Sequence, residues 1–109
     1  DYLYSKDAAG ILFSLAKKGT DGKIYCLGSG KVNKLCNYIK VIRDSININL
    51  QLGIGKIPYS DKKVMYLWAD ISDILNDLNY KYQYDFNRGI QETINWYKDY
   101  YIEKHSINE

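Results

Sequence analysis

Residues 56–78 read KIPYSDKKVMYLWADISDILNDL, and the rest of the chain is organised around this stretch. It contains the only proline, Pro58, then a polar turn, Ser60–Lys63, and then a strand-like apolar run, Val64–Ala69. A loop of mixed charge between a proline of fixed φ and an apolar run is a natural place to hold a polar ligand. The same composition is found in ordinary surface turns, so both interpretations stay open at this point.

Length and composition indicate one globular domain, residues 1–109, with a modest core. The hydrophobic content of 46% and the charged content of 26% are ordinary, and the net charge of +2 does not favour nucleic acid or a membrane surface as a partner. The sequence contains no run of eighteen apolar residues and no signal peptide, so we expect no membrane segment and a cytoplasmic location. The spacing of Cys26 and Cys36 matches no metal or redox motif, and we expect two buried thiols.

Apolar periodicity and turn residues predict the order of the elements. They predict a helix capped by Asp7 and ended by Gly19, a strand over 23–27, a helix capped by Asn33, an extended segment over 50–57, a strand over 64–69, a helix over 72–78 and a long helix capped by Asp85. This order favours the α/β class, with helices packed on a short sheet. The opening residues, Asp1–Tyr4, read as the middle of a longer protein, and we expect the chain to be a part of one.

Several smaller patterns each have a functional and a structural interpretation. Gly28-Ser29-Gly30-Lys31 could cradle a phosphate with its backbone amides, although it lacks P-loop spacing and is more typical of a tight turn. The acidic residues of the short helix could gather a cation or form a solvated edge, with Asp70 as a helix cap; they are Asp70, Asp73 and Asp77.

Basic and aromatic residues raise the same choice. Three lysines near Tyr59 could form a small anion site or be plain surface; they are Lys56, Lys62 and Lys63. The alternating tyrosines of residues 80–84 could stack on a base, but packing over the core edge is the default. His105, the only histidine, has no partner pattern beside it, and we expect it to be solvated.

Taken in order, the motifs resemble a known enzyme family. They are Asp1-Tyr2-x-Tyr4-x-x-Asp7-Ala8-Ala9, Gly22-x-x-Tyr25-x-x-Gly28-Ser29-Gly30, Gly53-x-Gly55-x-Ile57-Pro58-Tyr59, Ala69-Asp70-Ile71-Ser72 and Gly89-Ile90-x-x-Thr93-Ile94-x-Trp96. Together they cover nearly the whole chain and resemble the C-terminal, substrate-binding part of extended short-chain dehydrogenase/reductases. The Pro-Tyr and Ala-Asp motifs are closest to the epimerases, dehydratases and 4-keto reductases of that family, which act on nucleotide-diphosphate sugars.

The resemblance implies that the remaining parts of the enzyme lie outside this chain. Members of the family carry an N-terminal Rossmann domain that binds NAD(P) and a catalytic Tyr-x-x-x-Lys pair. Tyr100-x-x-x-Lys104 has that spacing but lies at the far end of the last helix, so we interpret it as a coincidence. The resemblance therefore implies no catalytic, coenzyme or metal residue here, a chain that is inactive alone, and a homo-oligomeric parent enzyme.

The resemblance also implies a substrate site around the Pro-Tyr pair, formed by Pro58, Tyr59, Ser60, Lys62 and Lys63. The family has a phosphate-binding arginine just after this pair and an acidic ribose contact three residues later, and this sequence has Ser60 and Lys63 there. Ser60 cannot form a bidentate charge pair, so Lys62 or Lys63 would have to supply the positive charge. The alternative hypothesis is a free-standing α/β interaction module that binds a protein or a nucleic acid through its tyrosines and lysines.

Overall fold

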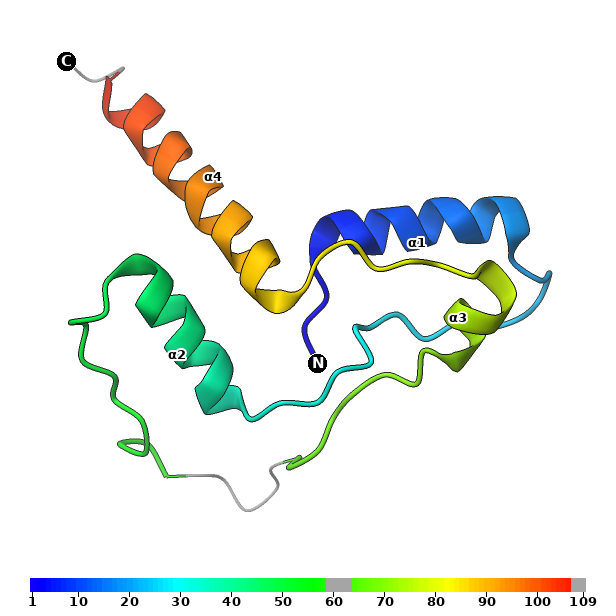
Figure 1. The fold of residues 1–109 in the computed structure, drawn as a ribbon, viewed down its shortest axis with the longest axis horizontal. Coiled ribbons are helices and arrows are strands. Elements are labelled where there is room, and N and C mark those ends of the chain that lie inside the picture. The colour runs from blue at the N-terminus through cyan, green and yellow to red at the C-terminus, as the bar shows by residue number, and fades with distance from the viewer. Residues whose placement is uncertain (59–63, 107–109) are drawn as a thin grey trace.

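The computed structural model of the chain describes residues 1–58 and 64–106, with side chains described as far as Ile102. Its regular structure consists of α1 (Ser5–Lys18), α2 (Leu35–Ile46), α3 (Ser72–Leu78) and α4 (Phe86–Ser106). Figure 1 shows two helix pairs, α1 beside α3 and α2 beside α4, with the N-terminus between them. The protein is thus built as two small helical units joined by extended chain.

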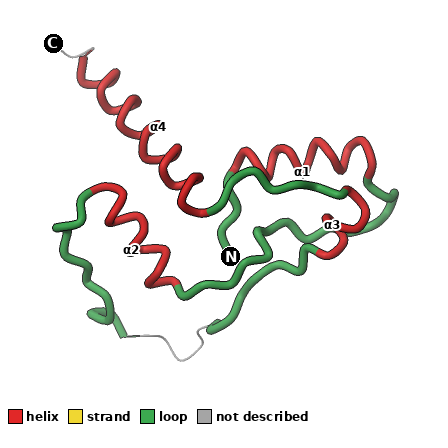
Figure 2. The backbone as a smooth tube through the Cα atoms, viewed as in Figure 1, coloured by secondary structure: helices red, strands yellow, loops and turns green. Residues whose placement is uncertain are grey.

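The predicted α/β class is wrong, because the described residues form four helices and no strand (Figure 2). The segments predicted as strands, 23–27 and 64–69, are not helical, but they do not pair in a ladder. They approach each other near Gly28 and Ala69, where a Cβ on the glycine would lie 2.5 Å from the alanine Cβ. A nearly continuous apolar run is typical of a strand covered on both faces, and the described part of the chain supplies no such covering layers.

The helix periods were predicted more accurately than the helix starts. α3 and α4 begin after the expected acidic residues: the Asp85 carboxylate accepts a hydrogen bond of 2.8 Å from the Arg88 amide, which confirms Asp85 as a cap. Asp70 accepts from both the amide and the hydroxyl of Ser72, so it also caps its helix start. The other two predicted caps are wrong, since Tyr4 precedes α1 and Lys34 precedes α2.

Two small clusters hold the helix pairs. Ile11, Ile74 and Leu78 form a buried cluster between α1 and α3, and partly buried side chains pack around it: Leu3, Leu15, Tyr25, Tyr80 and Tyr82. Between α2 and α4, Tyr38 is 7% exposed and Ile94 is 8% exposed. The default interpretation of Tyr80 and Tyr82 is therefore confirmed, because both rings cover the edge of a core.

The molecule is open and flat. Its Cα radius of gyration is 17.8 Å and its principal extents are 51 × 44 × 20 Å, whereas a compact chain of this length has a radius of gyration of about 13 Å. It exposes 9023 Å², while a compact monomer of the same mass exposes about 6,200 Å². The chain therefore leaves about 2,800 Å² more surface uncovered than a self-contained domain would.

Candidate functional site

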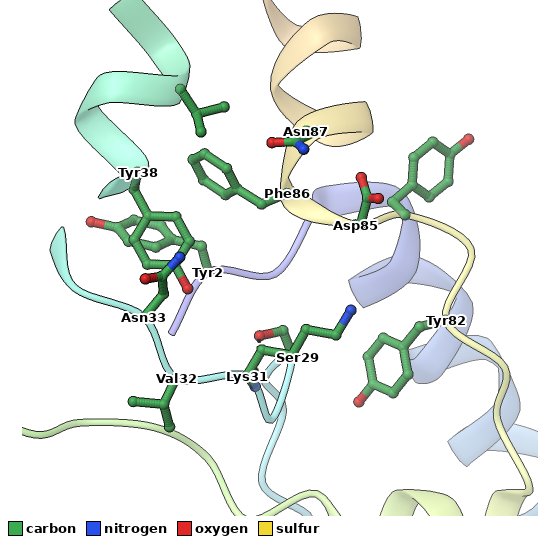
Figure 3. Close-up of a pocket in the computed structure, with 12 residues that line it drawn as sticks. Tyr2, Ser29, Lys31, Val32, Asn33, Tyr38, Tyr82, Asp85, Phe86 and Asn87 are labelled. Carbon is green, nitrogen blue, oxygen red and sulfur yellow. Dashed lines mark hydrogen bonds between the residues drawn. The ribbon is translucent and has the colours of Figure 1, made fainter. Parts of the chain in front are cut away.

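Two adjoining hollows lie around Tyr2 and Tyr38. The first, here called the aromatic pocket, has a volume of about 350 Å³ and lies between α2, α4 and the segment after Gly28 (Figure 3). The second, here called the wide groove, has a volume of about 870 Å³ and is bounded by residues 32–38 on one wall and 64–67 on the other. Both volumes are in the range of ligand sites in proteins. Four residues line both hollows: Tyr2, Val32, Asn33 and Tyr38.

Three aromatic rings form one wall of the aromatic pocket. The ring centroids of Tyr38 and Phe86 are 4.4 Å apart, and Tyr2 lies edge-on to Tyr38 at 4.8 Å. Figure 3 shows Lys31 extending toward the space between Tyr82 and Asp85. The pocket therefore combines aromatic faces with one cation, a combination that suits a flat polar ring carrying negative charge.

The wide groove contains the N-terminus of α2. Lys34 is the residue before the helix, its side chain makes no cap, and the first turn holds no acidic residue. The Asn33 side-chain oxygen accepts from the Lys34 amide at 2.8 Å and from the Asn37 side chain at 2.7 Å. Within the described residues, the amides of Leu35 and Cys36 donate to no acceptor. A helix start with open amides and an adjoining lysine attracts anions.

The Gly28-Ser29-Gly30 loop is already occupied by an anion from the chain itself. The Asp1 carboxylate accepts from the Ser29 amide at 2.8 Å, the Ser29 hydroxyl at 2.6 Å and the Gly30 amide at 3.2 Å. The same carboxylate accepts from the Ala69 amide at 3.0 Å. These donors are not directed at a ligand, so the loop acts as a structural turn that joins three distant segments.

Asp7 has a similar structural role that the sequence reasoning missed. It is 1% exposed, and its carboxylate accepts from the Tyr80 hydroxyl at 3.0 Å and from the amides of Gln83 and Tyr84 at 3.0 and 2.9 Å. Burial, followed by this hydrogen bond to Asp7, raises the pKa of Tyr80 to about 12. The only signal in the sequence was an acidic residue at the start of a helix, which also suits an ordinary cap.

The acidic residues of α3 are used within the chain. Lys23 lies 2.7 Å from Asp73 and 2.6 Å from Asp77, and the Tyr25 hydroxyl donates to Asp77 at 2.7 Å. The hydrogen bond from Lys23, and then that from Tyr25, lowers the pKa of the Asp77 carboxyl. No group of three or more metal-ligating side chains occurs among the residues described, so these carboxylates are better understood as partners of Lys23.

A second charged cluster connects α1 to α4. Lys6 lies 2.5 Å from Glu92, and the Tyr4 hydroxyl donates to the same carboxylate at 3.2 Å. The hydrogen bond from Lys6 lowers the pKa of the Glu92 carboxyl. Arg88 lies over the ring of Tyr84 at 4.4 Å. Tyr84 is thus packed beneath a cation and not open for stacking on a base.

The expected substrate loop is only partly visible. Pro58 is exposed, whereas Tyr59, Ser60, Lys62 and Lys63 lie outside the described residues. The described chain resumes at Val64, which lines the wide groove. Both cysteines are free, but the expectation of two buried thiols is wrong, because Cys26 is exposed and Cys36 is partly buried. The side chain of His105 also lies outside the described part.

One comparison with known proteins gives a relative. The uncharacterized protein MJ1055 of Methanocaldococcus jannaschii is 28% identical over 97 residues, which are 89% of this chain and 29% of that protein. The relative is itself uncharacterized. The chain spans less than one third of its length. No family model and no solved structure matches the chain.

A search of the described residues for membrane-spanning helices finds none that is both long enough and apolar enough.

Proposed function

We propose that this chain is the substrate-binding part of an NAD(P)-dependent enzyme that epimerises, dehydrates or reduces a nucleotide-diphosphate sugar. The coenzyme and the catalytic residues belong to a Rossmann half that precedes Asp1, and the chain is inactive without it. The observation that carries the proposal is the wide groove. It has the open N-terminus of α2 and Lys34 on one wall, and its other wall begins where the Tyr59–Lys63 loop ends.

This geometry suits a diphosphate. The Leu35 and Cys36 amides and the Lys34 ammonium group offer hydrogen bonds and positive charge at one wall. Lys62 and Lys63 immediately precede Val64, so they bring two further cations near the opposite wall. Lysines at this position act as point charges in place of the family's bidentate arginine, which favours weaker binding.

The packing of the motifs also supports the resemblance. Three of the five motifs meet at one carboxylate, since Asp1 of the first accepts from Ser29 and Gly30 of the second and from Ala69 of the fourth. Tyr4 of the first motif packs against Gly89 of the last, where a Cβ would lie 3.1 Å from the tyrosine ring. Segments that are far apart in sequence are thus joined by the residues that the resemblance rests on.

The test is a titration of the chain with a nucleotide-diphosphate sugar, followed by amide NMR signals. We expect shifts at Lys34–Cys36 and at Tyr59–Lys63, and no shifts there with the uncharged nucleoside. Lys34→Ala should weaken binding about fivefold, while Lys40→Ala, which removes an exposed lysine of the same helix, should leave it unchanged within about a factor of two. The absence of any shift at millimolar ligand would count against the proposal.

The reading frame upstream of Asp1 provides a second test. A glycine-rich strand-turn-helix start and a Tyr-x-x-x-Lys pair there would support the proposal. A frame that starts at Asp1 would favour the interaction module instead, and titration with single-stranded oligonucleotides at two salt concentrations would test its nucleic-acid version.

A further inference from the structure

Five successive apolar side chains are exposed in the segment Val64–Trp68, here called the apolar run. Their exposed fractions are 72% for Val64, 62% for Met65, 76% for Tyr66, 77% for Leu67 and 51% for Trp68. Successive side chains of extended backbone point to opposite sides. Both sides of the apolar run are therefore exposed at once, which an ordinary surface segment lying on a core does not show.

The backbone of the apolar run is also open. Across residues 1–58 and 64–106, no backbone–backbone hydrogen bond involves residues 64–70. A partner that covers the run has to supply main-chain hydrogen bonds as well as apolar contacts. Such a partner is a polypeptide, since a lipid surface offers no regular array of main-chain donors and acceptors.

The size of the uncovered surface limits the choice of polypeptide. The chain exposes 9023 Å², about 2,800 Å² beyond a compact monomer of its mass. Large obligate interfaces bury about 1,000 to 2,500 Å² on each partner. A second copy that meets this chain through one patch would leave part of the excess exposed, whereas a larger polypeptide folded around the chain could cover it.

The position of Asp1 indicates which polypeptide this is. Asp1 accepts from the Ala69 amide at 3.0 Å, and its amine lies 3.2 Å from the Leu67 carbonyl oxygen. In a longer protein, the residues before Asp1 would therefore start beside the end of the apolar run. The Methanocaldococcus jannaschii relative also has a length of which this chain covers only 29%.

We infer that the apolar run, Val64–Trp68, is the segment through which this chain docks on the polypeptide that precedes Asp1, with both of its sides buried in the contact. The inference rests on the proposed function for the existence of that polypeptide, and it adds the surface that binds it. The wide groove, whose second wall is the apolar run, would then lie at the junction of the two halves. Docking would thereby close the groove beside the proposed diphosphate site.

The experiment compares hydrogen–deuterium exchange in the 109-residue chain and in the full-length protein. We expect amides of residues 64–68 to exchange about 100-fold more slowly in the full-length protein, because the docked run opens only with the interface. Leu67→Lys and Tyr66→Lys place a charge on either side of the run and should remove this protection. The matched control is Phe13→Lys, which changes a 63% exposed apolar residue of α1 and should leave the protection intact.

Each outcome separates the docking surface from the proposed function. Fast exchange of the run in a full-length protein that still binds NAD(P) and the nucleotide sugar would overturn the docking surface alone. Slow exchange beside a polypeptide that lacks a coenzyme site would support the docking surface and overturn the proposed function. Protection that already appears in the 109-residue chain and rises with its concentration would assign the run to a second copy and overturn the inference. Unchanged protection in both lysine variants would also overturn it, provided that α1 amides confirm that the variants are folded.

Discussion

At the scale of single residues, the Asp7 carboxylate connects α1 to the segment before α4. It is 1% exposed and accepts one hydroxyl and two backbone amides. In Asp7→Asn the new amide group is a donor facing donors, so we expect the free energy of unfolding to fall by about 3 kcal/mol. Urea unfolding followed by circular dichroism measures the change. Asp21→Asn, in an exposed turn, is the control and should stay within about 0.5 kcal/mol; equal effects of the two variants would contradict the assignment.

Tyr80 gives the same contact a pH dependence. Burial and the hydrogen bond to Asp7 raise its pKa to about 12 in the folded chain, against about 10 in an unfolded one. Between these values the unfolded state loses the proton first, so stability is complete below about pH 10 and falls as the pH rises to about 12. We expect Tyr80→Phe to flatten this fall in unfolding experiments between pH 9 and pH 12. An identical slope in the wild type and the variant would show that other tyrosines cause it.

The roles of these two residues could not be predicted from the sequence, because their partners are distant. Asp7 and Tyr84 are 77 residues apart, whereas a helix cap is satisfied within three residues. Local chemistry therefore favoured the cap interpretation. The same limit applies to Asp1, whose acceptor atoms occupy the amides that the Gly28–Gly30 loop was considered to offer to phosphate.

At the scale of elements, the helices were predictable and the strands were not. A helix forms its hydrogen bonds within itself, so the apolar period and the cap at Asp85 were enough to place α4. A strand needs a neighbour, and the run Val64–Ala69 has none in the described chain. The run was correctly recognised as extended, but the predicted sheet required chain that lies elsewhere. The two hollows were not predicted either, since they depend on how α2 and α4 meet.

The cap of α4 leads to a prediction for that helix. The Asp85 carboxylate accepts from the Arg88 amide at 2.8 Å and places a negative charge at the helix N-terminus. Asp85→Ala should therefore lower the free energy of unfolding by about 1 kcal/mol. Asp99→Ala removes the same side chain from an exposed position farther along α4 and should change it by less than about 0.5 kcal/mol. Helix content and urea midpoints of the two variants test this, and a larger loss in Asp99→Ala would contradict it.

At the scale of the whole molecule, the helices bury too little surface to form a self-contained domain. The two clusters contain only a few fully covered side chains, and 23 large apolar residues in the described chain are exposed. Charged and polar side chains are nevertheless paired at the joints between segments, as at Asp1 and Asp7. Specific joints beside large uncovered apolar surface are what we expect of a part that is shaped for a larger body.

This openness predicts the response of the isolated chain to urea. The chain exposes 9023 Å² when folded, and an unfolded chain of its mass exposes about 18,400 Å². Folding thus buries about three quarters of the surface that a compact domain of the same length would bury, so the urea m-value should be lower by about one quarter. Small-angle scattering should show a radius of gyration near 18 Å in place of about 13 Å. An m-value and a radius typical of a compact domain, both independent of protein concentration, would show that the chain closes on itself. A urea midpoint that rises with concentration would show instead that copies of the chain cover one another.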